Sequence, residues 1–268
     1  MDDKGRESGH LMLITPERVF YAGLVGRPRE RCQGAFNVYV ALKGGLWLTL
    51  ADGGERYGEL FVVPSNIRHT IASDHRSAIA VLIEPESLRP GALDDLAVRL
   101  TGPEQSAFIS KIRSAYEMLR NRRSGEDITS AMFDSMCFGE ALPRRELDPR
   151  VVRAIAQIGK FSGEPVTAAS CAAEAGLSSS RFLHLFKEET DIAFRSFRAW
   201  KRARHLLHFA NQDLNLAHLA QDIGYPDSTH FSHSIRRFYG LKPRAIFVGS
   251  RDLAIYRSTE TVRLAEAS

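Results

Sequence analysis

The 268-residue chain has few cysteines and no long apolar run. Its three cysteines, Cys32, Cys137 and Cys171, are far apart and form no CxxC pair, which argues against a disulfide framework and a cysteine zinc site. No apolar stretch approaches the ~18 residues that a membrane-spanning helix needs, and the charged segment 1–10 does not resemble a signal peptide. These absences predict a cytoplasmic protein with reduced thiols and no membrane contact.

Signatures of catalysis are also missing. Ser178, Ser179 and Ser180 follow one another, but the chain has no GxSxG sequence and no Ser, His and Asp arrangement around them. We therefore expect no catalytic residue, no cofactor and no enzymatic activity.

The composition is that of a globular protein, with 44% hydrophobic and 25% charged residues. A chain of this length commonly divides into two domains. The net charge is only +4, but residues 148–250 carry 14 Lys and Arg against 9 Asp and Glu, whereas residues 1–147 carry 19 against 20. The basic segment suits a polyanionic partner, and a solvated basic surface explains the excess almost as well.

The N-terminal half predicts short β-strands and then helices. Seven apolar runs, separated by Gly, Pro, Asp and Asn, indicate a small all-β barrel or sandwich. The runs are 11–14, 18–23, 36–42, 46–50, 60–63, 69–71 and 78–83. Apolar residues at three- and four-residue steps predict a helix over 104–121, and a shorter helix follows over 127–138. The first helix could pack against the barrel or form a dimer seam.

The C-terminal half predicts several short helices and contains an internal repeat. Five polar residues precede apolar-periodic runs as helix N-caps: Asp148, Thr167, Ser178, Asn215 and Asp227. Two segments 48 residues apart share one pattern: Ala172-x-x-x-Gly176-Leu177 and Ala220-x-x-x-Gly224-Tyr225. A short helix, a glycine turn and a second helix make the helix-turn-helix motif, and two copies, at about 167–187 and 215–239, are joined by a helical segment over 193–210.

The second helix of each copy has a polar and cationic outer face. In the first copy this face carries Ser180, His184 and Lys187. In the second copy it carries five residues: Thr229, Ser232, His233, Arg236 and Arg237. A helix in the major groove of DNA needs hydrogen-bonding side chains for base edges and cations for phosphates. We assign Lys187, Arg236 and Arg237 to phosphates, although a solvated amphipathic helix would show the same pattern.

The C-terminal region resembles the AraC/XylS family of bacterial transcription regulators over about 148–248. The resemblance rests on Leu219-Ala220-x-x-x-Gly224-Tyr225, Phe231-Ser232, Arg236 and Tyr239-Gly240-Leu241-Lys242-Pro243, on the weaker first copy, and on Phe197, Trp200 and Arg202 in the connecting helix. It implies two recognition helices in successive major-groove segments of double-stranded DNA, and RNA polymerase as a partner. The positions that match the family's base contacts are Ser180, Leu183, His184, Ser228, Thr229, Ser232 and His233. His184 and His233 stand where arginine is frequent, so the family's DNA sequences do not transfer.

The N-terminal half resembles a cupin, the small β-barrel often attached to this family. The resemblance rests on Gly58-x5-Pro64-x-Asn66-x2-His69. It places Arg31, Gln33 and Asn37 where a metal-binding cupin carries His, His and Glu, which leaves too few ligands, so we expect no metal. His69, Arg31 and Tyr39 are candidates for binding an unknown small-molecule effector, and His69 could equally be a structural histidine.

The sequence thus predicts an α+β protein with a small N-terminal β-barrel, following helices, and an all-α domain with two helix-turn-helix motifs. We place a cupin-like sensor or dimerisation domain at 1–141, a linker at 142–147, the DNA-binding domain at 148–250 and a tail at 251–268. The predicted function is a sequence-specific DNA-binding regulator, by family habit an activator, that senses a small molecule or forms a homodimer. Two alternatives stay open: control by a protein partner that docks on the barrel, and a cupin enzyme fused to a helical domain.

Overall fold

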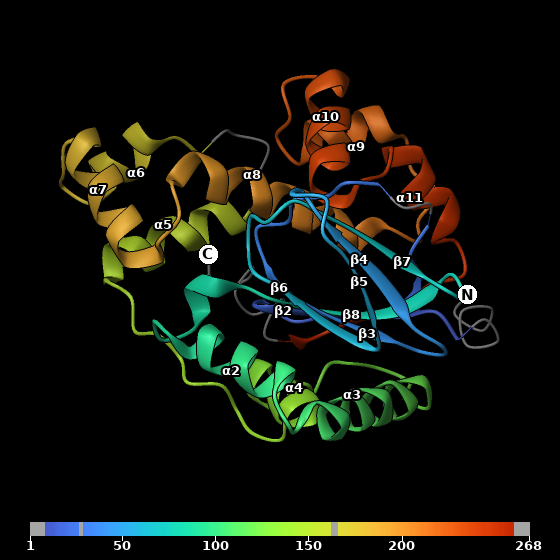
Figure 1. Ribbon diagram of the computed structural model, residues 1–268. Helices are drawn as coiled ribbons and strands as arrows, with labels where there is room; N and C mark the ends of the chain where they lie inside the picture. Colours follow the sequence, from blue (N-terminus) through green and yellow to red (C-terminus); the bar gives the residue numbers. More distant parts are fainter. Residues whose placement is uncertain (1–8, 27–28, 162–165, 260–268) are drawn as a thin grey trace.

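The computed structural model describes residues 9–26, 29–161 and 166–259. Two β-sheets form the middle of the molecule, with helices α2, α3 and α4 on one side and the C-terminal helices on the other (Figure 1). The α+β fold class, with N-terminal sheets and a C-terminal helical region, is confirmed. We call strands β1 to β8 the β module and helices α5 to α11 the helix-turn-helix region.

The predicted strands are present, and two strands were missed. The strands are β1 Leu11–Ile14, β2 Arg18–Leu24, β3 Phe36–Ala41, β4 Leu46–Leu50, β5 Glu55–Gly58, β6 Leu60–Val63, β7 His69–Ser73, β8 Ser77–Ile83 and β9 Ala254–Arg257. Strand β5 was missed because it has an exposed, polar sequence without an apolar run. A six-stranded sheet has the order β6-β3-β8-β2-β1-β9, and a three-stranded sheet has the order β5-β4-β7.

Both faces of the six-stranded sheet are buried, which explains its nearly continuous apolar strands. On one face, residues such as Leu13, Phe20 and Val81 share a core with helices α2 to α4. The opposite face is covered by two different parts of the molecule. The three-stranded sheet packs over Tyr39 and its neighbours, and the helix-turn-helix region packs over residues of β1, β2 and β8.

The helices that follow the β module pack against the six-stranded sheet. They are η1 Pro85–Ser87, α2 Ala92–Thr101, α3 Gln105–Arg120 and α4 Ser130–Phe138. Helices α3 and α4 correspond to the predicted 104–121 and 127–138. The apolar face of α3, which includes Phe108 and Ile112, is buried in the core beneath the sheet. Helix α2 was not predicted, although Leu96 and Leu100 carry a helical spacing.

The C-terminal helices are α5 Pro149–Gly159, α6 Ala168–Glu174, α7 Ser179–Thr190, α8 Phe194–His205, η2 Leu206–Phe209, α9 Leu216–Asp222, α10 Ser228–Tyr239 and α11 Pro243–Gly249. Five of these helices, α5, α6, α7, α9 and α10, begin where the polar caps predict them. The side chains of all five predicted caps accept hydrogen bonds from backbone amides of the helix that follows. The segment expected to connect the two motifs is a helix, α8, that tightens into the 3-10 helix η2.

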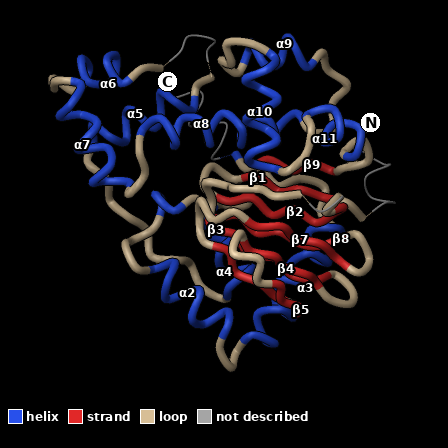
Figure 2. The backbone as a smooth tube through the Cα atoms, turned by 45° about the horizontal axis from the view of Figure 1, so that its top comes forward, coloured by secondary structure: helices blue, strands red, loops and turns tan. Residues whose placement is uncertain are grey.

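The segment expected as a tail returns to the first sheet. Strand β9 pairs in parallel with β1, in the register Leu11 with Ala254 through Ile14 with Arg257, and lies at the edge of the sheet next to α11 (Figure 2). This strand was missed because its only pairing partner lies at the other end of the sequence. Residues 260–268 of the predicted tail lie outside the described residues.

Candidate nucleic-acid interface and an apolar cavity

The sequence repeat in the helix-turn-helix region is also a repeat of hydrogen bonds. In the first copy, Gly176 has a φ of +65° and the amide of Leu177 donates to the carbonyl of Ala172. In the second copy, Gly224 has a φ of +79° and the amide of Tyr225 donates to the carbonyl of Ala220. A positive φ favours glycine because it has no Cβ. The same closed turn therefore orients α7 on α6 and α10 on α9.

Each second helix buries its apolar face and exposes its polar face. Phe182 and Phe186 of α7 pack in the core of the first copy, and Phe231, Ile235 and Phe238 of α10 pack in the core of the second. The predicted base contacts are exposed, apart from the partly buried Ser232: Ser180, Leu183, His184, Ser228, Thr229 and His233. The predicted phosphate contacts Lys187, Arg236 and Arg237 are exposed as well. Both faces are open to a partner, and the roles of these residues stay predictions.

The N-terminus of α10 is held by one carboxylate. Asp227 Oδ1 accepts from the amides of Thr229 and His230, both at 2.8 Å, and its Oδ2 lies 2.7 Å from His230 Nδ1. These bonds, the His230 amide first, lower the pKa of Asp227. The cap therefore keeps the base-contact candidates Ser228 and Thr229 at the start of a regular helix.

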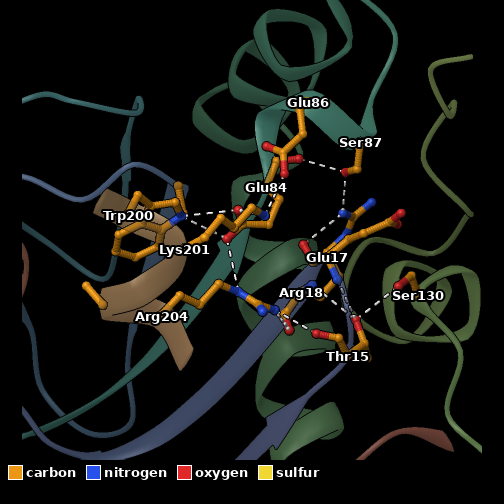
Figure 3. A network of polar contacts seen from close by, with 12 residues as sticks. Thr15, Glu17, Arg18, Glu84, Glu86, Ser87, Ser130, Trp200, Lys201 and Arg204 are labelled. Atoms are coloured by element: carbon orange, nitrogen blue, oxygen red, sulfur yellow. Dashed lines mark hydrogen bonds and ion pairs between the residues drawn. The ribbon is translucent and has the colours of Figure 1, made fainter. Parts of the chain in front are cut away.

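The connecting helix α8 is joined to the β module by a buried ionic cluster (Figure 3). Glu84, at the end of β8, accepts from Trp200 Nε1 at 3.0 Å and from Lys201 Nζ, and forms an ion pair with Arg204 Nε at 3.0 Å. Lys201 also pairs with Glu86 at 2.6 Å. Arg204 reaches further and donates to the Thr15 carbonyl at 2.6 Å.

Charge compensation explains how this cluster is tolerated inside the protein. Burial alone would raise the pKa of Glu84, but the charges of Lys201 and Arg204 hold it below its ordinary value. Burial raises the pKa of Glu86, and the neighbouring charge of Glu84 adds to the rise. Burial would lower the pKa of Lys201, whereas both glutamates raise it. Removing one partner of such a buried pair leaves an uncompensated charge, so the cluster fixes α8 on the β module.

An apolar cavity of about 200 Å³ lies between the β module and the helix-turn-helix region. Strands β1, β2, β3 and β8 of the six-stranded sheet contribute to its lining. The β module contributes residues such as Val19, Tyr21 and Leu82, and the helix-turn-helix region contributes residues such as Tyr239 and Leu241. Both parts of the chain therefore contribute walls to the cavity.

The cavity contains one cationic side chain without a counter-ion. Arg31 lines it, and the Nε and Nη2 atoms of Arg31 are buried and have no hydrogen-bond partner among the described residues. No carboxylate of the described residues forms an ion pair with this guanidinium. Buried guanidinium nitrogens without an acceptor are costly, so this arrangement suits an anionic ligand.

The three predicted effector residues are brought together here. Tyr39 also lines the cavity, and its hydroxyl lies 2.8 Å from His69 Nε2 and 3.0 Å from Gln33 Oε1. His69 is buried behind Tyr39, and its backbone forms a two-way hydrogen-bonded bridge with Arg31. Burial lowers the pKa of His69 to about 4, although the bond to the Ile67 carbonyl opposes this. Burial raises the pKa of Tyr39 to about 12, with the charge of Arg31 opposing the rise.

The residues of the helix-turn-helix region that close the cavity were missed. The sequence singled out Tyr239 and Leu241 only as parts of the motif Tyr239-Gly240-Leu241-Lys242-Pro243. Nothing local in the sequence points to a shared cavity, because its two walls come from segments that are more than 100 residues apart in the chain. The ionic cluster was missed for the same reason, because its glutamates and its cationic residues come from distant parts of the chain. Of its members, only Glu84 lies near a strand end that can be recognised in the sequence.

Comparison with known proteins identifies the C-terminal part. A model of a helix-turn-helix domain family matches residues 171–247. Residues 171–247 form an AraC-type helix-turn-helix domain. The AraC-type domain includes both glycine turns and the helices α7, α8 and α10. The AraC/XylS resemblance seen in the sequence is therefore confirmed. No curated protein sequence matches the chain. No helix in the described part of the chain is long and apolar enough to cross a membrane.

Solved structures extend the likeness beyond the AraC-type domain. An apo variant of ToxT from Vibrio cholerae strain SCE256 aligns with a TM-score of 0.53 and 12% identity, over 87% of this chain and 97% of that chain. ToxT from Vibrio cholerae O395 aligns with a TM-score of 0.50 and 11% identity, over 87% and 98%. The DNA-binding domain of AdpA, in complex with a target DNA, aligns with a TM-score of 0.37 and 19% identity, over 39% and 95%. At these identities the ToxT structures show a common fold.

Proposed function

We propose that the protein is a sequence-specific DNA-binding transcription regulator whose activity responds to a small anionic effector. The observation that carries the DNA-binding part is the duplicated motif. Helices α7 and α10 expose matching polar and cationic faces, and the rest of the described chain leaves these faces uncovered. Two such helices on one connecting helix suit two successive major-groove segments, about 34 Å apart.

The DNA-binding part is tested with the full-length protein. The protein would select fragments from genomic DNA, and hydroxyl-radical footprinting would map the selected sites. Protection of two segments on one face of the DNA is expected. Selection of no sequence over bulk DNA, even at low salt where phosphate contacts are strongest, would contradict the proposal.

Two substitutions separate base contacts from phosphate contacts. His233→Ala should relax discrimination at one or two base pairs by about 1–3 kcal/mol each, whereas Lys187→Ala should weaken binding to all sequences and reduce the salt slope by about one unit. Binding titrations at several salt concentrations, on the selected site and on single-base variants, measure both effects. Uniform weakening by both substitutions would contradict the division of roles.

The effector part of the proposal rests on the cavity. Its volume of about 200 Å³ exceeds the ~30 Å³ share of one liquid water but lies below the ~300–1,000 Å³ of drug-sized pockets. The walls are mostly apolar, and Arg31, with two guanidinium nitrogens that have no hydrogen-bond partner among the described residues, supplies the one cationic side chain. The ligand class that this combination suits is a small apolar molecule with a carboxylate or a similar anionic group.

Short apolar carboxylates serve as probes of this site. Octanoate and 4-phenylbutyrate should raise the unfolding temperature of the wild type, because a ligand that binds only the folded state stabilises it. Their uncharged amides should raise it less, and Arg31→Met should remove the difference between acid and amide. Arg56→Met, on the exposed strand β5 of the same module, is the matched control and should behave like the wild type. Equal shifts for acids and amides in the wild type would contradict the role of Arg31.

A further inference from the structure

The two helix-turn-helix copies are held by the β module in different ways. The core of the first copy, which includes Phe182, Phe186 and Phe197, contains no residue of the β module. The core of the second copy is continuous with the β module, because Phe231 and Phe238 share it with Met12, Val19, Leu82 and other strand residues. The second copy and the β module therefore share one packed core.

The C-terminal end of α10 is held by one short piece of the β module, Arg29–Cys32, which we call the capping segment. The amide of Cys32 donates to the carbonyl of Arg237 at 2.8 Å, near the end of α10. Gly240 closes the helix with a φ of +69°, and a Cβ built there would lie 2.8 Å from the Arg29 carbonyl oxygen and 3.1 Å from that of Glu30. The capping segment thus lies against the helix end with no room for a side chain between them.

The capping segment also carries the cationic group of the cavity. The side chain of Arg31 lines the cavity, and the next residue, Cys32, makes the bond to α10. The backbone of Arg31 is fixed on its other side by the two-way bridge to His69. A single peptide unit therefore separates the proposed anion contact from the hydrogen bond that holds the end of α10.

The first copy is connected differently, through contacts of α7 with η1, which follows strand β8 in the chain. No residue of α7 lines the cavity. The C-terminal end of α7 contacts the segment before α5 through exposed or partly exposed groups, in which Arg145 donates to Asp191 at 2.9 Å and the amide of Asp148 donates to Glu189 at 2.7 Å. Exposed ion pairs of this kind contribute little to stability.

From these contacts we infer that occupation of the cavity acts on DNA recognition through the capping segment, and that it changes the contacts of α10 while leaving those of α7 unchanged. The inference rests on the proposed function, since it assumes that α7 and α10 bind separate half-sites. An anion beside Arg31 compensates the buried charge and stabilises the capping segment against α10. Arg31→Met removes that charge and is expected to imitate the occupied state.

The experiment measures binding of the full-length wild type and of Arg31→Met to three DNA duplexes. One duplex carries the selected site, and in each of the other two a single half-site is replaced by an unrelated sequence. His184→Ala and His233→Ala assign the half-sites, because each should relax base discrimination in one of them only. We expect Arg31→Met to change the Kd for the intact site at least ~5-fold, the lower end of ordinary coupling between two sites. The change should persist when the α7 half-site is replaced and disappear when the α10 half-site is replaced.

A pair of glycine substitutions tests the route through the capping segment. Gly240→Ala should push the segment away from α10, and on this background the effect of Arg31→Met should disappear. Gly176→Ala is the matched control, because Gly176 has nearly the same positive φ but no atom within 4 Å of a built Cβ. The effect of Arg31→Met should persist on the Gly176→Ala background. If Gly240→Ala does not fold, the comparison of Arg31→Met with the wild type on the three duplexes still tests whether the effect is confined to the α10 half-site.

Three results would overturn the inference: an equal effect of Arg31→Met at both half-sites, an effect confined to the α7 half-site, or no effect in a variant that melts cooperatively like the wild type. Failure of the proposed function has a different signature, in which the wild type does not distinguish the selected site from the replaced sequences. Arg56→Met is again the control and should leave all three Kd values unchanged.

Discussion

Replacing Gly34 by alanine tests how closely the β module approaches the connecting helix. A Cβ at Gly34 would lie 2.5 Å from Trp200 Cγ and 2.8 Å from its Cδ1. The indole has no room to move, because Trp200 is 2% exposed, its Nε1 donates to Glu84, and its ring packs 5.3 Å from that of Phe238. Overpacking of a core costs about 1–3 kcal/mol, and the reduced freedom of the unfolded chain offsets about 0.4–1 kcal/mol. We expect a net loss of about 1–2 kcal/mol.

Thermal unfolding followed by circular dichroism measures this loss. One kcal/mol corresponds to roughly 2–4 °C in the unfolding temperature of a protein of 150–250 residues. Gly159→Ala is the control, because Gly159 ends α5 without a positive φ and a Cβ there would contact nothing within 4 Å. The control should be slightly more stable than the wild type. If Gly34→Ala were as stable as Gly159→Ala, the close packing of Gly34 on Trp200 would be refuted.

Three further predictions concern buried charge, pH and capping. Glu84→Gln should destabilise the protein by about 3 kcal/mol or more in urea unfolding, because it leaves Lys201 and Arg204 buried with less compensation; a loss below about 1 kcal/mol would contradict the role of the cluster. Burial, with neighbouring cationic groups adding to it, lowers the pKa of His208 to about 3, so the folded protein keeps this histidine neutral where the unfolded chain protonates it. Its contribution is present above pH 6.5 and is lost as the pH falls from 6.5 towards 3, so stability measured against pH should fall less steeply in His208→Gln; an unchanged slope would argue against burial of this ring. Asp227→Ala should cost about 0.5–2 kcal/mol and weaken binding at the α10 half-site, whereas Asp227→Asn should retain the cap; equal losses in both would show that charge rather than capping matters.

The helical part of the fold was predictable because its signals are local. Each helix of the two motifs begins at a side chain that caps it, and each turn needs a glycine with a positive φ, so Thr167, Asn215, Gly176 and Gly224 mark the elements within a few residues. The apolar spacing along α3 also predicted which face of this helix is apolar, and the structure buries that face against the sheet. The outward faces of α7 and α10 followed from the same periodicity.

The features that join the two halves were not predictable from local patterns. Glu84 and Lys201 are 117 residues apart, and the Cys32 amide and the Arg237 carbonyl are more than 200 apart. The cupin resemblance singled out Arg31 and His69, but it could not show that the helix-turn-helix region closes the space beside Arg31. Only the packed structure brings such pairs together, because their contact depends on how whole layers stack.

The parallel pairing of β9 with β1 has a consequence for synthesis of the protein on the ribosome. Until residues 254–257 have emerged, the apolar strand β1 forms an open edge of the six-stranded sheet, with unpaired amides and carbonyls that favour association with other chains. The nascent β module therefore stays vulnerable throughout translation of the helix-turn-helix region. A truncation before Ala254 should leave a product that aggregates, even though every strand of the β module is intact.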